Sequence, residues 1–92
     1  MEIDHRATSE FWEEYSALPD AVRTLADKQF ALLKSDPQHP SLQFKKIGER
    51  HGTEIWSARV SLNYRALAIK LSGDYLWFWI GDHKRYDLLI SQ

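Results

Sequence analysis

The spacing of apolar side chains changes abruptly near Leu42, and this change restricts the fold more than any other feature of the sequence. Before Leu42, apolar residues recur every three to four positions, as they do on the buried side of a helix. After it, apolar and polar residues alternate with a period of two, which is typical of strands with one buried face. Helices followed by consecutive strands predict a two-layer α+β fold.

Two helices are predicted in the first half of the chain, over residues 8–18 and 19–36. In the first, apolar residues lie at i, i+4 and i+7 from Phe11 onward. Pro19 suits the first turn of the second helix, because its missing N–H has no partner to lose there. A short edge strand is plausible before them, over residues 2–6. The two helices are expected to form a hairpin.

Four strands are predicted around the segments LQFKKI, IWSARV, YRALAIKL and YLWFWI, joined by short turns. In the second segment, alternation places Ala58 on one face and Arg59 on the other. In the last, it places Trp77 and Trp79 on the same face as Tyr75. The expected fold is therefore a short N-terminal strand and a helical hairpin packed on a twisted antiparallel sheet of about four strands.

The length and composition indicate one domain over residues 1–92 that folds without disulfides or metal. The chain has no cysteine, which removes thiol catalysis and cysteine-ligated zinc and fits a reducing cytoplasm. The first fifteen residues contain acids and no apolar core of a signal peptide, and no apolar run approaches the length of a membrane span. The four histidines lack metal-ligand spacing, so neither a metal site nor a cofactor is expected. We expect a cytoplasmic protein.

The charge is divided unevenly along the chain, although the formal net charge is only −1. Residues 1–42 hold eight acidic and four basic side chains, whereas residues 43–92 hold five acidic and eight basic ones. The second half can therefore face an anion while the whole molecule stays slightly acidic. Two ordinary solvated surfaces would explain the same distribution.

Two arginines lie inside otherwise apolar strands and close to one tight turn, namely Arg59 and Arg65. An arginine remains charged in proteins, so each must find a carboxylate, backbone carbonyls or a bound anion. A structural pairing with Glu54 or Asp82 and the binding of a phosphate group both satisfy this requirement.

One histidine has a distinctive setting, at the end of the last predicted strand in the segment WFWIGDHKRY. His83 lies two residues after Gly81, is followed directly by Lys84 and Arg85, and precedes Tyr86 by three residues. Histidine is the natural proton-transfer group near neutral pH. His83 is thus a candidate catalytic residue, although a histidine in a loop can also be inert.

The order of elements resembles the RelE/ParE superfamily of bacterial toxins, closest to the subgroup described as a ParE-like toxin domain. The motifs W-S-x-R-V-x-x-x-Y-R-A-L at 56–67 and W-F-W-I-G-x-H-x-x-Y at 77–86 carry this resemblance. The segment at 18–48 is also similar, so the resemblance extends over nearly the whole chain. It implies the toxin component of a type II toxin–antitoxin system with the compact α+β fold of that superfamily.

The RelE-like branch of the superfamily implies a ribosome-dependent, metal-free endoribonuclease that cleaves mRNA by attack of the 2′-hydroxyl and so inhibits translation. By position, Arg59 and Arg65 would bind and stabilise the phosphate, and His83 would act as acid or base. Tyr86 would stack on a base or assist proton transfer.

The same resemblance implies further residues around these four. Glu54 or His51 would be a second proton-transfer group. A set of basic residues would contact the nucleic acid, namely Lys45, Lys46, Arg50, Lys84 and Arg85.

Two other functions are compatible with the same resemblance. The ParE-like branch implies a non-enzymatic inhibitor of DNA gyrase, and a third alternative is a non-toxic module that only binds an antitoxin. In each case the implied partner is a cognate antitoxin protein, forming a hetero-oligomer with this chain. The ribosome and mRNA, or alternatively gyrase, would be the target, with no membrane involved.

Overall fold

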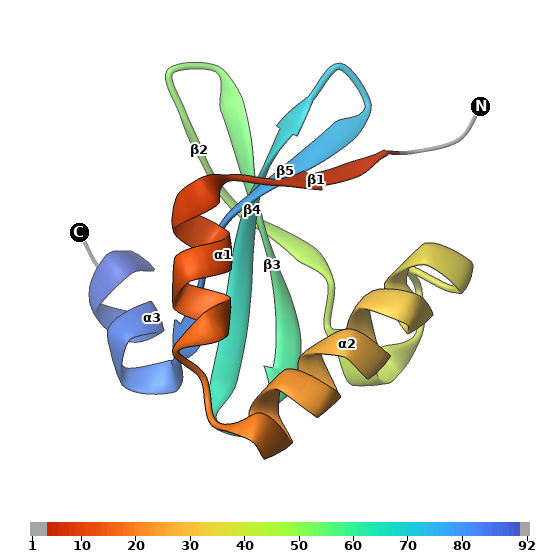
Figure 1. The fold of residues 1–92 in the computed structure, drawn as a ribbon. Coiled ribbons are helices and arrows are strands. Elements are labelled where there is room, and N and C mark those ends of the chain that lie inside the picture. The colour runs from red at the N-terminus through yellow and green to blue at the C-terminus, as the bar shows by residue number, and fades with distance from the viewer. Residues whose placement is uncertain (1–3, 91–92) are drawn as a thin grey trace.

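The computed structural model describes residues 4–90, which form five strands and three α-helices around one core (Figure 1). The elements follow one another as β1 (His5–Ala7), α1 (Ser9–Ser16), α2 (Asp20–Ser35), a 3₁₀ turn (Pro40–Leu42), β2 (Lys45–Arg50), β3 (Thr53–Ser61), β4 (Tyr64–Leu71), β5 (Asp74–Asp82) and α3 (His83–Ile90). The expected two-layer α+β architecture is therefore confirmed.

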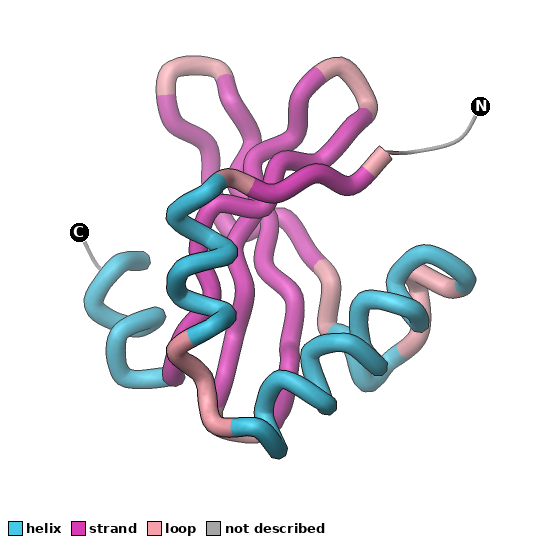
Figure 2. Tube along the Cα trace, viewed as in Figure 1, coloured by secondary structure: helices cyan, strands magenta, loops and turns pink. Residues whose placement is uncertain are grey.

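The five strands make one mixed sheet in the order β1-β5-β4-β3-β2 (Figure 2). The strands from β2 to β5 form an antiparallel meander, as predicted. The short N-terminal strand joins the other edge and runs parallel to β5. This parallel pairing is possible because the connection between β1 and β5 passes through all the intervening elements.

Local sequence explains where the first two helices begin. The Thr8 side chain caps α1, because its Oγ1 accepts a hydrogen bond from the Phe11 N–H at 3.1 Å. Pro19 occupies the capping position of α2 rather than its first turn, so the helix begins one residue later than predicted. The helices diverge from the short connection between them (Figure 1), with α1 against β5 and α2 against β3.

Small side chains line the sheet face beneath these helices. Ala58, Ala66 and Ala68 are buried there together with Val60 and Trp77, and Ala68 is completely inaccessible to solvent. Alanines allow the helices to approach the sheet closely, while the neighbouring aromatic ring fills the remaining volume. We call this the covered face, and the opposite side of the sheet the open face.

A β-bulge in β5 corrects the predicted arrangement of its tryptophans. Ala68 pairs with Trp77 and Leu67 pairs with Trp79, so Phe78 is an extra residue in β5. The extra residue reverses the alternation, and Trp79 leaves the face that Tyr75 and Trp77 share. Simple periodicity placed all three on one face, which is wrong for Trp79.

The segment after Gly81 is a helix, α3, where the sequence indicated a loop. Asp82 caps it, since its Oδ1 accepts a hydrogen bond from the Arg85 N–H at 2.9 Å. Strand β2 also begins later than expected. Leu42 lies in the 3₁₀ turn and not in a strand, and it is almost completely buried.

Candidate active site

The two strand arginines lie directly opposite each other on the open face. Arg59 of β3 pairs with Arg65 of β4, and Arg65 pairs with Gly81 of β5, so the three positions form one row across the sheet. Directly paired residues project from the same face of a sheet. Ala58 and Val60, which flank Arg59, project into the core on the other side.

The Arg65 guanidinium is held by backbone carbonyls of the β3–β4 turn and not by a carboxylate. Its Nη1 donates to the carbonyls of Ser61 at 2.7 Å, Tyr64 at 3.0 Å and Leu62 at 3.4 Å. Burial lowers the pKa of the Arg65 guanidinium, the positive charge of Arg59 lowers it further, and Tyr86 and Asp87 oppose this. Within residues 4–90, neither Glu54 nor Asp82 forms an ion pair with it.

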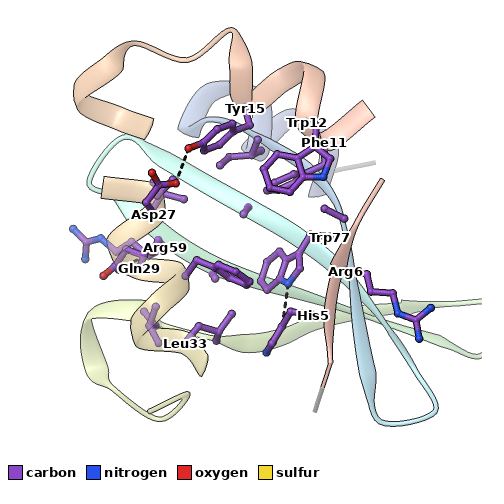
Figure 3. Close-up of a pocket in the computed structure, with 18 residues that line it drawn as sticks. His5, Arg6, Phe11, Trp12, Tyr15, Asp27, Gln29, Leu33, Arg59 and Trp77 are labelled. Atoms are coloured by element: carbon purple, nitrogen blue, oxygen red, sulfur yellow. Dashed lines mark hydrogen bonds between the residues drawn. The ribbon is translucent and has the colours of Figure 1, made fainter. Parts of the chain in front are cut away.

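The Arg59 guanidinium makes no hydrogen bond or ion pair with any residue of the described range 4–90. Its backbone is fixed instead, because the Arg59 carbonyl accepts a hydrogen bond from Gln29 Nε2 of α2 at 2.9 Å. The guanidinium points away from the cavity between the helices (Figure 3). Helix α2 thus holds the backbone of β3 at Arg59, while the charged Arg59 guanidinium stays available to a ligand.

Helix α3 places two further predicted residues beside this row. Tyr86 is buried, and its hydroxyl donates to Ser57 Oγ at 3.4 Å across the open face. The His83 N–H donates to the Asn63 carbonyl at 2.7 Å, which ties the start of α3 to the β3–β4 turn. Because Arg65 is also bound to this turn, the structure brings Arg59, Arg65, His83 and Tyr86 into one neighbourhood.

Asp87 belongs to the same cluster and was not identified from the sequence. Its Oδ2 lies 3.1 Å from His83 Nδ1, one helical turn away, and both side chains are about half exposed. A carboxylate on Nδ1 orients the imidazole and leaves Nε2 for another partner. The i, i+4 spacing is visible in the sequence, but it indicates a contact only once the segment is known to be helical.

Four other predicted residues lie away from the cluster. Lys46 pairs with Trp56, and Glu54 accepts a hydrogen bond from the Trp56 indole at 2.9 Å, so both belong to the covered side of the sheet. Arg50 and His51 lie at the β2–β3 turn, at the end of the sheet opposite the β3–β4 turn (Figure 1). The structure therefore does not bring the implied second proton-transfer group, Glu54 or His51, to the arginines.

The remaining predicted basic residues surround the cluster. Lys45 pairs with Ser57 and so shares the open face, one strand beyond the arginine row. Lys84 and Arg85 are exposed at the start of α3. Positive side chains thus approach the cluster from both the sheet and the helix.

An apolar cavity of about 230 Å³ lies elsewhere, between α1, α2 and the covered face (Figure 3). Tyr15 and Asp27 close one end, where the Tyr15 hydroxyl donates to Asp27 Oδ1 at 2.6 Å. At the other end, the Trp77 indole donates to His5 Nδ1 at 3.1 Å. Trp12 on its rim is 53% exposed and Phe30 is 41% exposed, so the cavity continues into an apolar surface.

Two further observations concern residues 4–90. No group of three or more histidine or acidic side chains in this part of the chain is arranged to hold a metal ion. In the same range, no helix combines the length and the apolar character needed to cross a bilayer.

No known family model matches this sequence, and neither does any curated protein sequence. Solved structures do match the fold. A chain of the archaeal RelE–RelB complex from Pyrococcus horikoshii OT3 superimposes with a TM-score of 0.71 at 14% identity, covering 92% of this chain and 99% of that one.

Two more structures are similar over the same extent. A chain of the RelB–RelE antitoxin–toxin complex from Methanococcus jannaschii gives a TM-score of 0.68 at 16% identity, covering 90% of this chain and 96% of that one. A copper-bound mutant toxin from Helicobacter pylori gives 0.60 at 12% identity, covering 90% and 97%. The chain has a RelE-like fold.

Proposed function

We propose that the protein is the toxin of a type II toxin–antitoxin system and that it is a ribosome-dependent endoribonuclease, acting on mRNA in the cytoplasm. One observation carries this proposal: Arg59 and Arg65 stand side by side on the open face, without a carboxylate partner among residues 4–90, next to the His83–Asp87 pair of α3. The likeness of the fold to toxins of RelE–RelB complexes supports the same reading.

The bonds made and broken in this reaction involve the RNA, these side chains and water. His83 Nε2 accepts the proton of the 2′-hydroxyl, the 2′-oxygen bonds to the adjacent phosphorus, the bond from phosphorus to the 5′-oxygen breaks, and the leaving oxygen takes up a proton from water. The products are a 2′,3′-cyclic phosphate and a 5′-hydroxyl end. Negative charge grows on the phosphate oxygens during this displacement, so fixed cations accelerate it.

Each side chain has a specific part in this scheme. Arg59 and the free Nη2 side of Arg65 stabilise the phosphate charge, because Arg65 Nη1 is occupied by carbonyls. His83 transfers a proton through Nε2, since Nδ1 faces Asp87. Tyr86 forms the wall beneath the scissile nucleotide, and Lys45, Lys84 and Arg85 attract the flanking backbone.

Controlled expression in bacteria tests this function. We expect growth arrest with wild-type protein and transcript 5′ ends that cluster within codons of translated messages. Arg59→Ala, Arg65→Ala and His83→Ala should each relieve the arrest, whereas Lys46→Ala, which changes a lysine of the covered side, should not. A triple variant of Arg59, Arg65 and His83 that remains fully toxic would refute the assignment.

The same cultures address the gyrase alternative. Trapped gyrase–DNA complexes and filamentous cells, with unchanged transcript ends, would show that the target is DNA gyrase. Growth at undiminished viability would favour a module that only binds an antitoxin.

The proposed partner is an antitoxin protein that covers the apolar cavity between α1 and α2. Trp12 and Phe30, which line the cavity, leave large apolar areas exposed at this surface, which is typical of protein-binding sites. Phe30→Glu should abolish rescue of growth by a co-expressed antitoxin while leaving toxicity intact. Lys28→Glu, on the same helix, is the matched control. Full rescue of the Phe30 variant would place the antitoxin elsewhere.

A further inference from the structure

A glutamine lies on the buried side of α2, between two residues of the core. Gln29 follows Ala26 by three positions and precedes Leu33 by four, and both of these neighbours are buried. This spacing places all three on one side of the helix. An apolar residue is expected at such a position, because a polar group that leaves water must find new hydrogen-bond partners. The contacts of the amide explain its presence here.

Both hydrogens of the Gln29 amide are used. Nε2 donates to the Arg59 carbonyl at 2.9 Å and to the Ser41 carbonyl at 3.2 Å. Because a carbonyl oxygen only accepts, these two partners determine which end of the amide faces the strand. The Gln29 side chain accordingly lies beside Arg59 at the wall of the apolar cavity (Figure 3). One side chain thus joins α2 to both β3 and the 3₁₀ turn.

The backbone of β3 has little other support at this point. Strand β2 pairs with β3 only as far as Ser57, so it does not reach Arg59. The pairing with β4 shifts by one residue directly after Arg59, which makes Val60 the extra residue of a β-bulge. A bulge interrupts the hydrogen bonds between strands. The Gln29 amide therefore supplies a hydrogen bond where the sheet provides fewer of them.

The two arginines of the row are held in different ways. Arg65 is held through its guanidinium, because Nη1 donates to carbonyls of the β3–β4 turn. The Arg59 guanidinium makes no hydrogen bond or ion pair within residues 4–90. The place of its charge depends on the backbone from which the side chain projects. Gln29 holds that backbone.

We infer that Gln29 is a positioning residue for the proposed cleavage, which acts on the phosphate through the backbone of Arg59 and does not itself contact RNA. The inference rests on the proposed ribonuclease function, in which Arg59 stabilises the charge of the phosphate. Such stabilisation requires that the cation is already in place when the negative charge develops. A misplacement of about 1 Å lowers a rate by up to about 100-fold. Gln29 exerts this effect from a helix on the opposite side of the sheet.

Gln29→Met tests this role, because methionine keeps the length of the side chain and removes the donor. The variant should fold, since Gln29 lines an apolar cavity that suits a thioether. We expect single-turnover cleavage of ribosome-bound mRNA to slow by about tenfold. Gln38→Met makes the same change at an exposed glutamine beyond the end of α2, and it should keep the wild-type rate.

The same substitution in Arg59→Ala separates positioning of Arg59 from general stability. Arg59→Ala removes the guanidinium but retains the carbonyl that Gln29 binds. In this background Gln29→Met should change the rate by no more than about twofold, because the group that it positions is absent. The midpoint of thermal unfolding should fall equally in both backgrounds, since the same hydrogen bonds are lost. A further tenfold loss of rate in Arg59→Ala would overturn the inference and leave Gln29 a purely structural role.

Nuclear magnetic resonance of the free protein tests the inference without RNA. In Gln29→Met, the backbone order parameters of Arg59 and Val60 should fall below the value of about 0.85 that is typical of a rigid backbone. Ile55, earlier in the same strand, should keep its wild-type value. Unchanged order at Arg59 would overturn the inference. Wild-type protein that cleaves no mRNA would refute the ribonuclease proposal instead, and the order parameters would still decide whether Gln29 fixes the Arg59 backbone.

Discussion

The two faces of the sheet are made by the same strands, but they differ in the burial and charge of their side chains. On the covered face, Ala58 of β3 pairs with Ala66 of β4, and both are buried beneath the helices. At the adjacent position of each strand, Arg59 and Arg65 pair on the open face and keep their charge. Neighbouring residues of one strand therefore differ in their surroundings: one side chain packs in the core, and the next carries a charge on the open face.

The covered face also supports the open one. Gln29 of α2 holds the Arg59 carbonyl and the Ser41 carbonyl, which fixes the backbone of β3 from the helix side. The β3–β4 turn holds both Arg65 and the first N–H of α3. A rigid scaffold of this kind lowers the cost of keeping two guanidinium groups close together.

The largest expected effect lies in the core. Leu42 is 1% exposed, and Leu42→Ala should lower the free energy of unfolding by about 2–5 kcal/mol, because it leaves a cavity. Chemical denaturation of the purified variant measures this change. Gln43→Ala, at the exposed neighbouring position, serves as the control. A loss below about 1 kcal/mol would mean that the core tolerates the void.

On the open face, His83→Ala should affect activity and leave stability almost unchanged. Loss of a proton-transfer group lowers a rate by about 100-fold or more. The side chain is half exposed, so the unfolding free energy should stay within about 0.5 kcal/mol of wild type. Cleavage of ribosome-bound mRNA and thermal unfolding measure the two quantities. A stable variant with full activity would remove His83 from the mechanism.

The start of α3 should show an intermediate effect. Asp82→Ala removes the side-chain acceptor of the Arg85 N–H and should cost about 1 kcal/mol of stability. Activity should fall as well, because the capped helix positions His83. Asp82→Ser retains a capping oxygen and should restore most of both, and failure of that rescue would argue against a capping role.

The smallest effect is a pH dependence that arises on the covered side. Burial, and next the charge of Lys34, lower the pKa of His5, while Asp4 and Asp74 oppose them. His5 therefore stays neutral to a lower pH in the folded protein than in the unfolded chain, and its neutral Nδ1 accepts the Trp77 indole N–H. As the pH falls below the ordinary histidine pKa, the unfolded chain binds the proton more readily, and stability decreases.

Denaturation at pH 7.5 and 5.5 measures this dependence, whose slope cannot exceed about 1.4 kcal/mol per pH unit for one proton. His5→Gln should flatten the difference, whereas His39→Gln should not. An equal pH dependence in wild type and His5→Gln would assign the effect to another group.

Periodicity predicts the covered face well because burial imposes it along whole strands. The alternation of Ala58 and Arg59 and the Arg59–Arg65 neighbourhood both follow from local spacing. The bulge at Phe78 does not, since an inserted residue has no signature in a segment that is apolar at every position. This is why Trp79 was placed on the wrong face.

The candidate site was predictable only in part for a similar reason. Helix α3 is a single short element of polar character, and the contact between His83 and Asp87 depends on it. Glu54 lies near the arginine strands in sequence but turns to the covered side beside Trp56. Alternation along β3 indicates this face, because Glu54 is an odd number of positions from Arg59 with no bulge between them.

The most direct test of the central claim compares one cation from each side of the sheet. Purified Arg59→Ala and Lys46→Ala are incubated with ribosomes carrying a defined mRNA, and the rate of cleavage is measured under single-turnover conditions. We expect Arg59→Ala to lose about 100-fold or more in rate and Lys46→Ala to retain it, since fixed charge at the phosphate supplies effects of this size. Equal rates for the two variants would contradict the assignment of the open face as the active surface.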